Sequence, residues 1–349
     1  MARGRTGPVG FSLEGDTVKY LELQGGLGGK HRIGIWGLRR FGGEDIPESA
    51  EAETPAEELP AEVTAGGPLM QPWTTGVLHK LRRYPVFASL PDSDVLVKFI
   101  SLPELNESEV ARMVELRHRE YLPMPRADIV YDFSIARFQL RHGEDEDEEA
   151  GAPAGEAELR VMVSGVERGV YLGLREVMGE RKVILRSIEL NQTALTRACN
   201  FLLGSENPGT YAILYLNDVY SMINFVVAGG LYYSRLLEQG LEALTPDQTG
   251  MRRLERLLRE LYRSVDFFSV ESRGIPVETL YLVNGGVAAD PAVGLRIQSF
   301  LAERLAVNVR LLHEAAAESD RLALPTGILA DTLALPLGLA LRNSTESGL

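Results

Sequence analysis

Two short turns carry residues of the kinds that could bind a nucleotide phosphate. The first contains Ser12, Glu14 and Gly15, and the second contains Tyr215 and Asn217. A glycine in a hairpin turn lets a phosphate approach backbone N–H groups, and an acid at the end of the preceding strand can hold a divalent metal through water. Only Gly15 is permissive here, so purely structural hairpins are the favoured interpretation of both turns.

Two further features bear on nucleotide chemistry. A carboxylate at Glu14 would repel a polyphosphate by several kcal/mol in a partly desolvated site unless a metal intervened. Gly285 and Gly286 follow a predicted strand and precede a helix, so they could bring backbone against a nucleotide, although any tight turn has this pattern. The five histidines lack ligand spacing, and no arrangement typical of covalent or metallohydrolase catalysis is present. We therefore predict no catalytic residues and no metal ligands.

The elements that position these turns repeat along the chain. Apolar residues alternate on both sides of the first turn, predicting a hairpin over residues 9–24 and a third strand over 31–40. Three short strands over 210–237 repeat the pattern. For a chain of 349 residues this duplication predicts a two-lobed α/β architecture with a cleft as the default ligand site.

The segments between the hairpins define the expected domains. Residues 91–164 read as strand, helix, strand, strand, with Asn106 capping the helix. Thr245-Pro246-Asp247-Gln248 predicts a capping box that opens a long amphipathic helix, and a last helix is expected over 326–342, broken near Pro336. The expected division is a first lobe core at 1–90 and 165–204, an α+β insertion at 91–164, a second lobe core at 205–240 and 279–349, and a helical part at 241–278.

The net charge of −13 is concentrated in two acidic segments, 42–68 and 143–156. Without the eight acids of the first and the six at 144–149, the chain has 35 acidic and 36 basic residues, which gives no basic footprint for nucleic acid. The single cysteine, Cys199, lies in a helical pattern and is expected to be a small buried hydrophobe. No apolar run approaches about 20 residues, so membrane association is expected only through a partner.

The order of features resembles the PilM family, cytoplasmic actin-like proteins of type IV pilus assembly related to FtsA in the actin–Hsp70 (ASKHA) fold group. No single motif is specific, but their order and spacing together are. The residues that carry the resemblance are 9–23 with Lys19; Leu102-Pro103; Glu120-Tyr121-Leu122-Pro123; Asp132; Ala194-Leu195-Thr196-Arg197-Ala198; Arg235 and Gly240; Ser264-Val265-Asp266-Phe267-Phe268; Asn284-Gly285-Gly286; and Gly338-Leu339-Ala340-Leu341-Arg342.

The chain departs from the family pattern at its phosphate turns. Members typically read Gly-x-Asp-Ile-Gly-Ser in the first and Asp-Ile-Gly in the second. Here Ser12 and Tyr215 stand where the acids would be, and Glu14 and Asn217 where the glycines would be. Any nucleotide site would have to use the remaining candidates, which are Gly15, Lys19, Asn217, Gly285 and Gly286, with Asp16 or Asp218 compensating after a shift in register.

The resemblance implies a two-lobed actin-like fold and a degenerate, non-catalytic scaffold that does not turn over ATP. It further implies a cytoplasmic protein that binds the N-terminal segment of a PilN-like inner-membrane protein, in a groove between the first lobe and the insertion, and so links a pilus or secretion platform to motor components. Self-association through the insertion follows by analogy with FtsA. The alternatives are an ATP/Mg²⁺-dependent switch or slow ATPase, and a GspL-like component of type II secretion.

Overall fold

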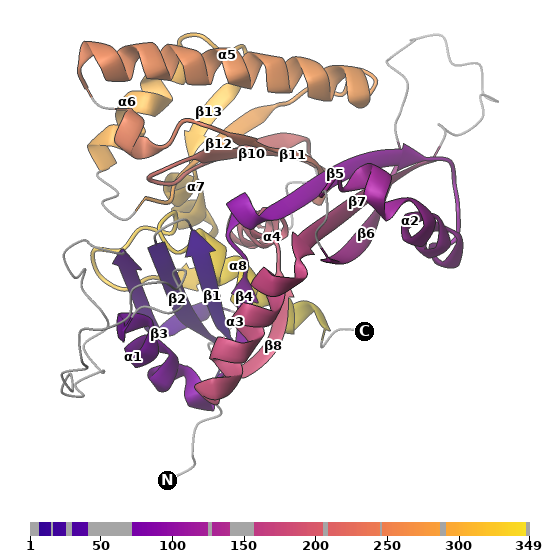
Figure 1. Cartoon of the computed structure of the whole chain (residues 1–349). Helices are drawn as coiled ribbons and strands as arrows, with labels where there is room; N and C mark the ends of the chain where they lie inside the picture. Colours follow the sequence, from indigo (N-terminus) through magenta and orange to yellow (C-terminus); the bar gives the residue numbers. More distant parts are fainter. Residues whose placement is uncertain are drawn as a thin grey trace. The chain divides into compact units, whose positions relative to one another are not determined.

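The computed structural model describes residues 7–14, 17–25, 30–40, 72–124, 128–139, 157–204, 209–244, 246–286 and 291–346 (Figure 1). The acidic segments 42–68 and 143–156, together with Gly15 and Asp16, lie largely or wholly outside these residues. The chain divides into two compact units. Unit 1 comprises Met1–Asp94, Arg168–Gly204 and His313–Leu349, and unit 2 comprises Val95–Glu167 and Ser205–Leu312.

Unit 1 is built on a six-stranded mixed sheet. The first three strands form an antiparallel meander, and β1 then pairs in parallel with β4, which pairs in parallel with β8. The spatial order is β14-β3-β2-β1-β4-β8, with β1 Val9–Glu14, β2 Thr17–Gln24, β3 His31–Arg40, β4 Pro85–Ser89, β8 Ile184–Glu189 and β14 Leu322–Ala323. The predicted hairpin over residues 9–24 and the third strand are confirmed.

Unit 1 contains five helices in the part of the chain that the structure describes, and α8 packs most closely on the sheet. They are α1 Pro72–Lys80, α3 Arg168–Glu180, α4 Asn191–Leu203, α7 Leu312–Ser319 and α8 Ala334–Glu346. Helix α8 contacts β1, β2 and α4. A Cβ at Gly10 would overlap the carbonyl oxygen of Pro336, and one at Gly338 would overlap that of Ala194. Glycine is therefore required at both positions because backbone meets backbone there.

The structure corrects one expectation for unit 1, adds one helix and confirms the burial of Cys199. The last helix begins at Ala334, not 326, with Pro336 in its first turn, where the missing N–H of proline is tolerated. Helix α7 was not predicted. Cys199 is fully buried on α4, as expected, and burial raises the pKa of its thiol well above the usual value.

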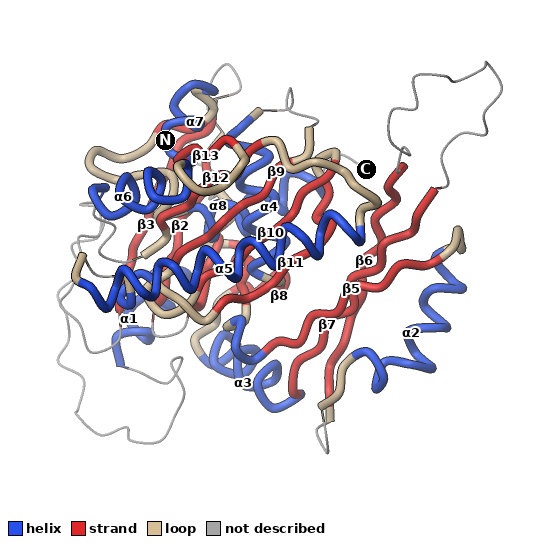
Figure 2. Tube along the Cα trace, turned by 90° about the horizontal axis from the view of Figure 1, so that it is seen from above, coloured by secondary structure: helices blue, strands red, loops and turns tan. Residues whose placement is uncertain are grey.

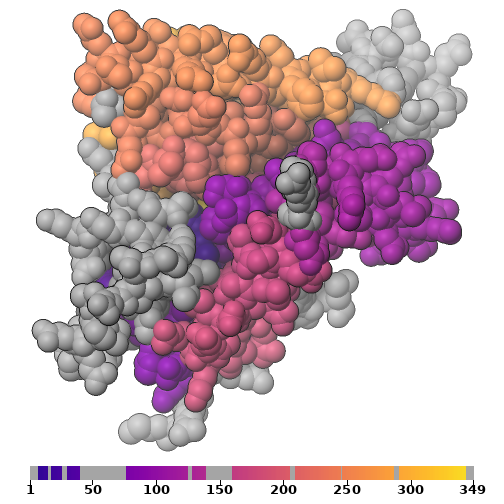
Figure 3. Space-filling view, viewed as in Figure 1, coloured from indigo at the N-terminus to yellow at the C-terminus, as the bar shows by residue number. Residues whose placement is uncertain are grey.

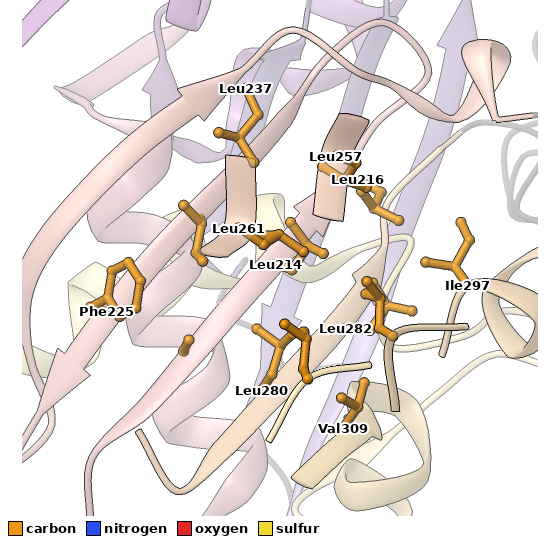
Figure 4. Close-up of a cluster of buried hydrophobic side chains, with 14 of the residues drawn as sticks. Leu214, Leu216, Phe225, Leu237, Leu257, Leu261, Leu280, Leu282, Ile297 and Val309 are labelled. Atoms are coloured by element: carbon orange, nitrogen blue, oxygen red, sulfur yellow. The ribbon is translucent and has the colours of Figure 1, made fainter. Parts of the chain in front are cut away.

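Unit 2 contains a five-stranded sheet in the order β11-β10-β9-β12-β13. Helices α5 and α6 pack on one face of it, and their leucines and isoleucines form a single core with the strands (Figure 4). Seen from above, α5 runs along the sheet over β10 and β11 (Figure 2). The elements are β9 Tyr211–Leu216, β10 Ser221–Val227, β11 Gly230–Leu237, β12 Thr279–Asn284, β13 Asn308–Leu311, α5 Gln248–Glu271 and α6 Pro291–Ala302.

Helix α5 starts later than the sequence pattern predicted. The cap is Asp247, whose Oδ1 accepts a hydrogen bond from the backbone N of Gly250 at 2.7 Å, so the expected capping box at Thr245 is wrong. The predicted amphipathic character is confirmed, since Leu254, Leu261 and Phe268 are buried on one face of the helix. Met251, in its first turn, is 43% exposed.

The rest of unit 2 is a three-stranded antiparallel sheet covered by a helix, in the order β5-β7-β6. Its elements are β5 Val95–Leu102, α2 Glu107–Tyr121, β6 Ile129–Gln139 and β7 Ala157–Glu167. The cap of α2 is the predicted one, since the Asn106 side chain accepts from Glu109 N at 3.0 Å and Asn106 N donates to the Glu109 carboxylate at 2.9 Å. The strand–helix–strand–strand order expected for 91–164 is therefore present.

The division into units differs from the expected one in two places. The C-terminal residues from His313 group with unit 1, not with 205–312, because α8 packs on β1 and α4. The three-stranded sheet groups with 205–312, because Arg160 of β7 is buried against β11 and α5. Its Nε donates to Tyr232 O at 3.3 Å and its Nη1 to the Glu271 carboxylate at 3.0 Å.

The close approach of α8 to α4 generates a stability prediction. Gly338→Ala should lower the free energy of unfolding by about 1–3 kcal/mol, since the added methyl overlaps the Ala194 carbonyl and the two helices must separate. Urea denaturation followed by circular dichroism measures the change. The matched control is Gly173→Ala in α3, where nothing lies within 4 Å and the substitution should stabilise by about 0.5–1 kcal/mol. Equal effects of the two variants would contradict the packing argument.

Candidate functional site

The first candidate phosphate turn is occupied by a buried network of its own side chains. Ser12 and Glu14 lie two residues apart on β1, so they point to the same side of the sheet, and Ser12 is directly opposite Lys19 of β2. Ser12 Oγ donates to Glu14 Oε1 at 2.7 Å, and Lys19 Nζ donates to Glu14 Oε2 at 2.7 Å. Both oxygens of the carboxylate are thus engaged within the hairpin.

The electrostatics of this hairpin differ from what the sequence suggested. Glu14 was expected to repel a polyphosphate, but its carboxylate is neutralised by the Lys19 ammonium in an ion pair whose side chains are each 1% exposed. Both charges are desolvated, so each depends on the other. Lys19, a candidate nucleotide-binding residue, is held by Glu14. The remaining candidate of this turn, Gly15, lies outside the described residues.

The second candidate turn is closed by Asn217. Its Oδ1 accepts hydrogen bonds from the backbone N of Val219 and of Tyr220, each at 2.8 Å. The side chain thereby holds the turn between β9 and β10 in its conformation. Its backbone N also donates to Tyr220 O at 3.1 Å. Asn217 is buried, and its position in place of a glycine therefore has a structural role in this hairpin.

The two glycines after β12 are packed against side chains of unit 2. Strand β12 pairs in parallel with β9, which brings Gly285 beside Tyr215. A Cβ at Gly285 would overlap the Tyr215 ring, and one at Gly286 would overlap Leu241 and the Asp218 carboxylate. Tyr215 is fully buried. The space that glycine opens at these positions is thus filled by the chain itself.

The structure therefore brings the candidate residues together in two separate groups. Ser12, Glu14 and Lys19 meet in unit 1, and Tyr215 meets Gly285 in unit 2, near Asn217. The neighbours of Gly286 are Asp218, which the sequence analysis named as a possible compensating acid, and Leu241, which it did not assign and which no local pattern marks. Within the described ranges, no group of three or more His, Cys, Asp or Glu side chains is placed to hold a metal ion.

A further polar cluster in unit 1 joins two motifs that carried the family resemblance. Arg197 of α4 donates through Nη1 to Glu189 Oε2 at 3.0 Å and to Gly338 O at 2.7 Å, and its Nη2 pairs with Glu189 Oε1. Arg342 of α8 lies 3.5 Å from the same carboxylate. The two sequence motifs are separated by about 140 residues but meet at Glu189, which the sequence analysis had not singled out.

The two sheets and their helices define the class of the protein: the chain has the actin-like α/β fold. No family model and no curated protein sequence matches it. Among solved structures, a chain of the PilM-PilN type IV pilus biogenesis complex matches with a TM-score of 0.66 at 18% identity, over 97% of this chain and 98% of that one. The predicted fold, including its likeness to PilM, is confirmed.

Two weaker similarities accompany this match. The cytoplasmic domain of EpsL, an inner-membrane component of the type II secretion system of Vibrio cholerae, has a TM-score of 0.44 at 9% identity, over 97% of this chain and 94% of its own. An actin-like ATPase fold protein of Bacteroides thetaiotaomicron has a TM-score of 0.41 at 11% identity, over 90% and 93%. Among the residues that the structure describes, no helix combines the length and the apolar character needed to cross a bilayer.

The buried pair in the first hairpin generates a second prediction. Lys19→Met should destabilise the chain by about 3–5 kcal/mol, because it leaves the Glu14 carboxylate buried without its counter-charge. Adding Glu14→Gln should recover most of that loss, since no uncompensated charge then remains. A double-mutant cycle by urea denaturation measures the coupling.

The control for this cycle is the exposed pair Arg256–Glu238, whose side chains are 56% and 79% exposed. Its loss should change stability by less than about 1 kcal/mol. If the effects of Lys19→Met and Glu14→Gln simply add, the two side chains do not depend on each other and the interpretation of the hairpin is wrong.

Proposed function

We propose that this chain is a non-catalytic, PilM-like component of a type IV pilus or related secretion platform. The observation that carries the proposal is the fold match over 97% of this chain to a chain of the PilM-PilN complex. The order of sequence motifs that resembles the PilM family supports the same assignment. In this role the chain acts by binding other proteins and not by turning over a substrate.

The filled phosphate turns support the non-catalytic part of the proposal. To bind at the first turn, a nucleotide phosphate would have to draw Lys19 away from Glu14 and so break the ion pair. The Glu14 carboxylate, left without its counter-charge, would then repel the phosphate. At the second turn, the Tyr215 ring fills the space beside Gly285 that a ligand would need. The alternative of an ATP-dependent switch rests on Gly285 and Gly286, and both already contact side chains of unit 2.

The proposed partner is the N-terminal cytoplasmic segment of a PilN-like inner-membrane protein. Such a segment binds as an extended peptide, drawing affinity from main-chain hydrogen bonds and specificity from side-chain pockets. Through it the chain would be held at the inner membrane and linked to cytoplasmic motor components.

Peptide binding tests the partner assignment. A fluorescent peptide of the first 20 or so residues of a PilN-like protein encoded beside this chain should bind with micromolar affinity in a polarisation assay, because main-chain pairing along a strand needs no nucleotide. A scrambled peptide of equal charge is the control. Equal affinity for both peptides, or none at millimolar protein, would contradict the partner assignment.

Calorimetry with ATP and Mg²⁺ tests the non-catalytic role. The purified chain should give no binding heat at millimolar ATP, because its own side chains occupy both turns. Micromolar binding that Gly285→Trp abolishes would overturn the scaffold proposal in favour of the ATP-dependent switch.

A restored variant extends the calorimetric test. The set Ser12→Asp, Glu14→Gly, Tyr215→Asp and Asn217→Gly returns the family pattern to both turns and should recover nucleotide binding. The first of these places a carboxylate directly opposite Lys19, which keeps the ammonium paired. Circular dichroism must show a native spectrum; a folded variant without binding would mean that the chain has diverged beyond these turns.

A further inference from the structure

Helix α5 carries a row of exposed arginines on its outer side. Arg252, Arg256, Arg259 and Arg263 are spaced by four, three and four residues, which places them on one face of the helix. We call these four residues the arginine stripe. With a rise of 1.5 Å per residue it is about 16 Å long. Leu254, Leu257 and Leu261 hold the opposite face in the core, so the stripe is exposed to solvent. Helix α5 itself is the orange band at the top of Figure 3.

The stripe is only partly neutralised by its neighbours. Arg256 pairs with Glu238 at 2.8 Å, and Arg263 pairs with Glu260 at 2.7 Å, although Glu260 is shared with Arg235. Arg252 and Arg259 make no ion pair within the described part of the chain.

The surrounding charges leave an excess of arginine on this surface. Arg253 adds a fifth exposed arginine to α5, and the exposed carboxylates nearby are Glu238, Glu255 and Asp266. Glu271, at the end of the helix, is taken by the buried Arg160. The face of α5 is therefore suited to an acidic ligand.

The sequence contains a segment of opposite charge in the connection between β6 and β7. Residues 144–149, Glu-Asp-Glu-Asp-Glu-Glu, are six consecutive acids in the connection between β6 and β7, outside the described residues. We call them the acidic tract. Its place in the sequence is fixed by Gln139 and Ala157, the paired ends of the two strands. The charge of the tract is opposite to that of the stripe.

The described residues place the root of this connection beside α5. Phe138, next to the end of β6, stacks edge-on with Tyr232 of β11 at 5.0 Å between ring centroids. Tyr232 in turn contacts Phe268 of α5 at 5.4 Å, and Phe268 is five residues, or about 7.5 Å of helix rise, from Arg263. Glu144 follows Phe138 by six residues, which can span about 20 Å when extended. The tract can therefore reach the stripe within one molecule.

We propose that the arginine stripe of α5 is a binding surface for acidic protein segments and that the chain's own acidic tract is its occupant, in cis. Each exposed ion pair contributes little alone, so the contact depends on several pairs acting together and on low ionic strength. Tethering the tract to β6 and β7 raises its effective concentration at the stripe without any further contact.

A competition experiment on the full chain tests the proposal. The probe is a fluorescein-labelled peptide of residues 141–152. In a variant with all six acids of the tract changed to their amides, the stripe is unoccupied, so the peptide should bind at least tenfold more tightly than to the unaltered chain at 50 mM salt. Adding Arg252→Gln, Arg256→Gln and Arg259→Gln to that variant should abolish the gain. Salt at 500 mM should abolish it as well.

The matched control removes three exposed arginines elsewhere in unit 2. Arg112→Gln, Arg117→Gln and Arg119→Gln on α2 change the net charge equally and should leave peptide binding unaltered. Circular dichroism confirms that each variant is folded. Equal affinity of the peptide for the unaltered and amide-substituted chains would overturn the proposal. So would a gain that survives loss of the three stripe arginines.

Analytical ultracentrifugation of the unaltered chain distinguishes a contact within one molecule from a contact between two copies. A monomer supports the proposal. A dimer that dissociates when the tract is neutralised would overturn the intramolecular contact and assign the stripe to the tract of a second copy.

Discussion

A buried charge must have a counter-charge, and this constraint explains most of what the first hairpin can do. The Glu14 carboxylate and the Lys19 ammonium are both removed from water, and each is tolerated because the other is 2.7 Å away. Ser12 completes the arrangement as a hydrogen-bond donor. The acid and the lysine of this turn are thus paired with each other and hold the two strands of the hairpin together, and the proposed non-catalytic role rests on this pairing.

In unit 2 the candidate turn is filled by the packing of a side chain and not by an ion pair. Glycines at the end of β12 are compatible with a ligand, but they equally allow a large side chain to come close, and here Tyr215 does so from the neighbouring strand. The two turns are thus filled in different physical ways, one by an ion pair and the other by an aromatic ring. Both kinds of change keep the hairpin geometry of the fold.

Local rules predicted the fold well, whereas the contacts around the candidate site residues depend on pairings between distant parts of the chain. Alternation of apolar residues and the Asn106–Glu109 capping box are properties of adjacent residues, and the structure confirms them. The start of α8 was misplaced because Ile328, Leu329 and Ala330 extend the apolar pattern upstream of Asp331 and Thr332. The grouping of α8 with unit 1 depends on contacts of Gly10 and Gly338 with distant backbone. The Glu14–Lys19 pair could have been found from the hairpin register, whereas the contact of Tyr215 with Gly285 requires the pairing of β9 with β12.

The environment of Arg160 has a mechanical consequence. Its guanidinium joins Ser101 of β5, Tyr232 of β11 and Glu271 of α5, and it also lies over the Tyr232 ring at 4.5 Å. A single buried side chain therefore fastens the three-stranded sheet to the five-stranded sheet and to the C-terminal end of α5. A force applied to the three-stranded sheet would therefore be transmitted along β7 through Arg160 to α5.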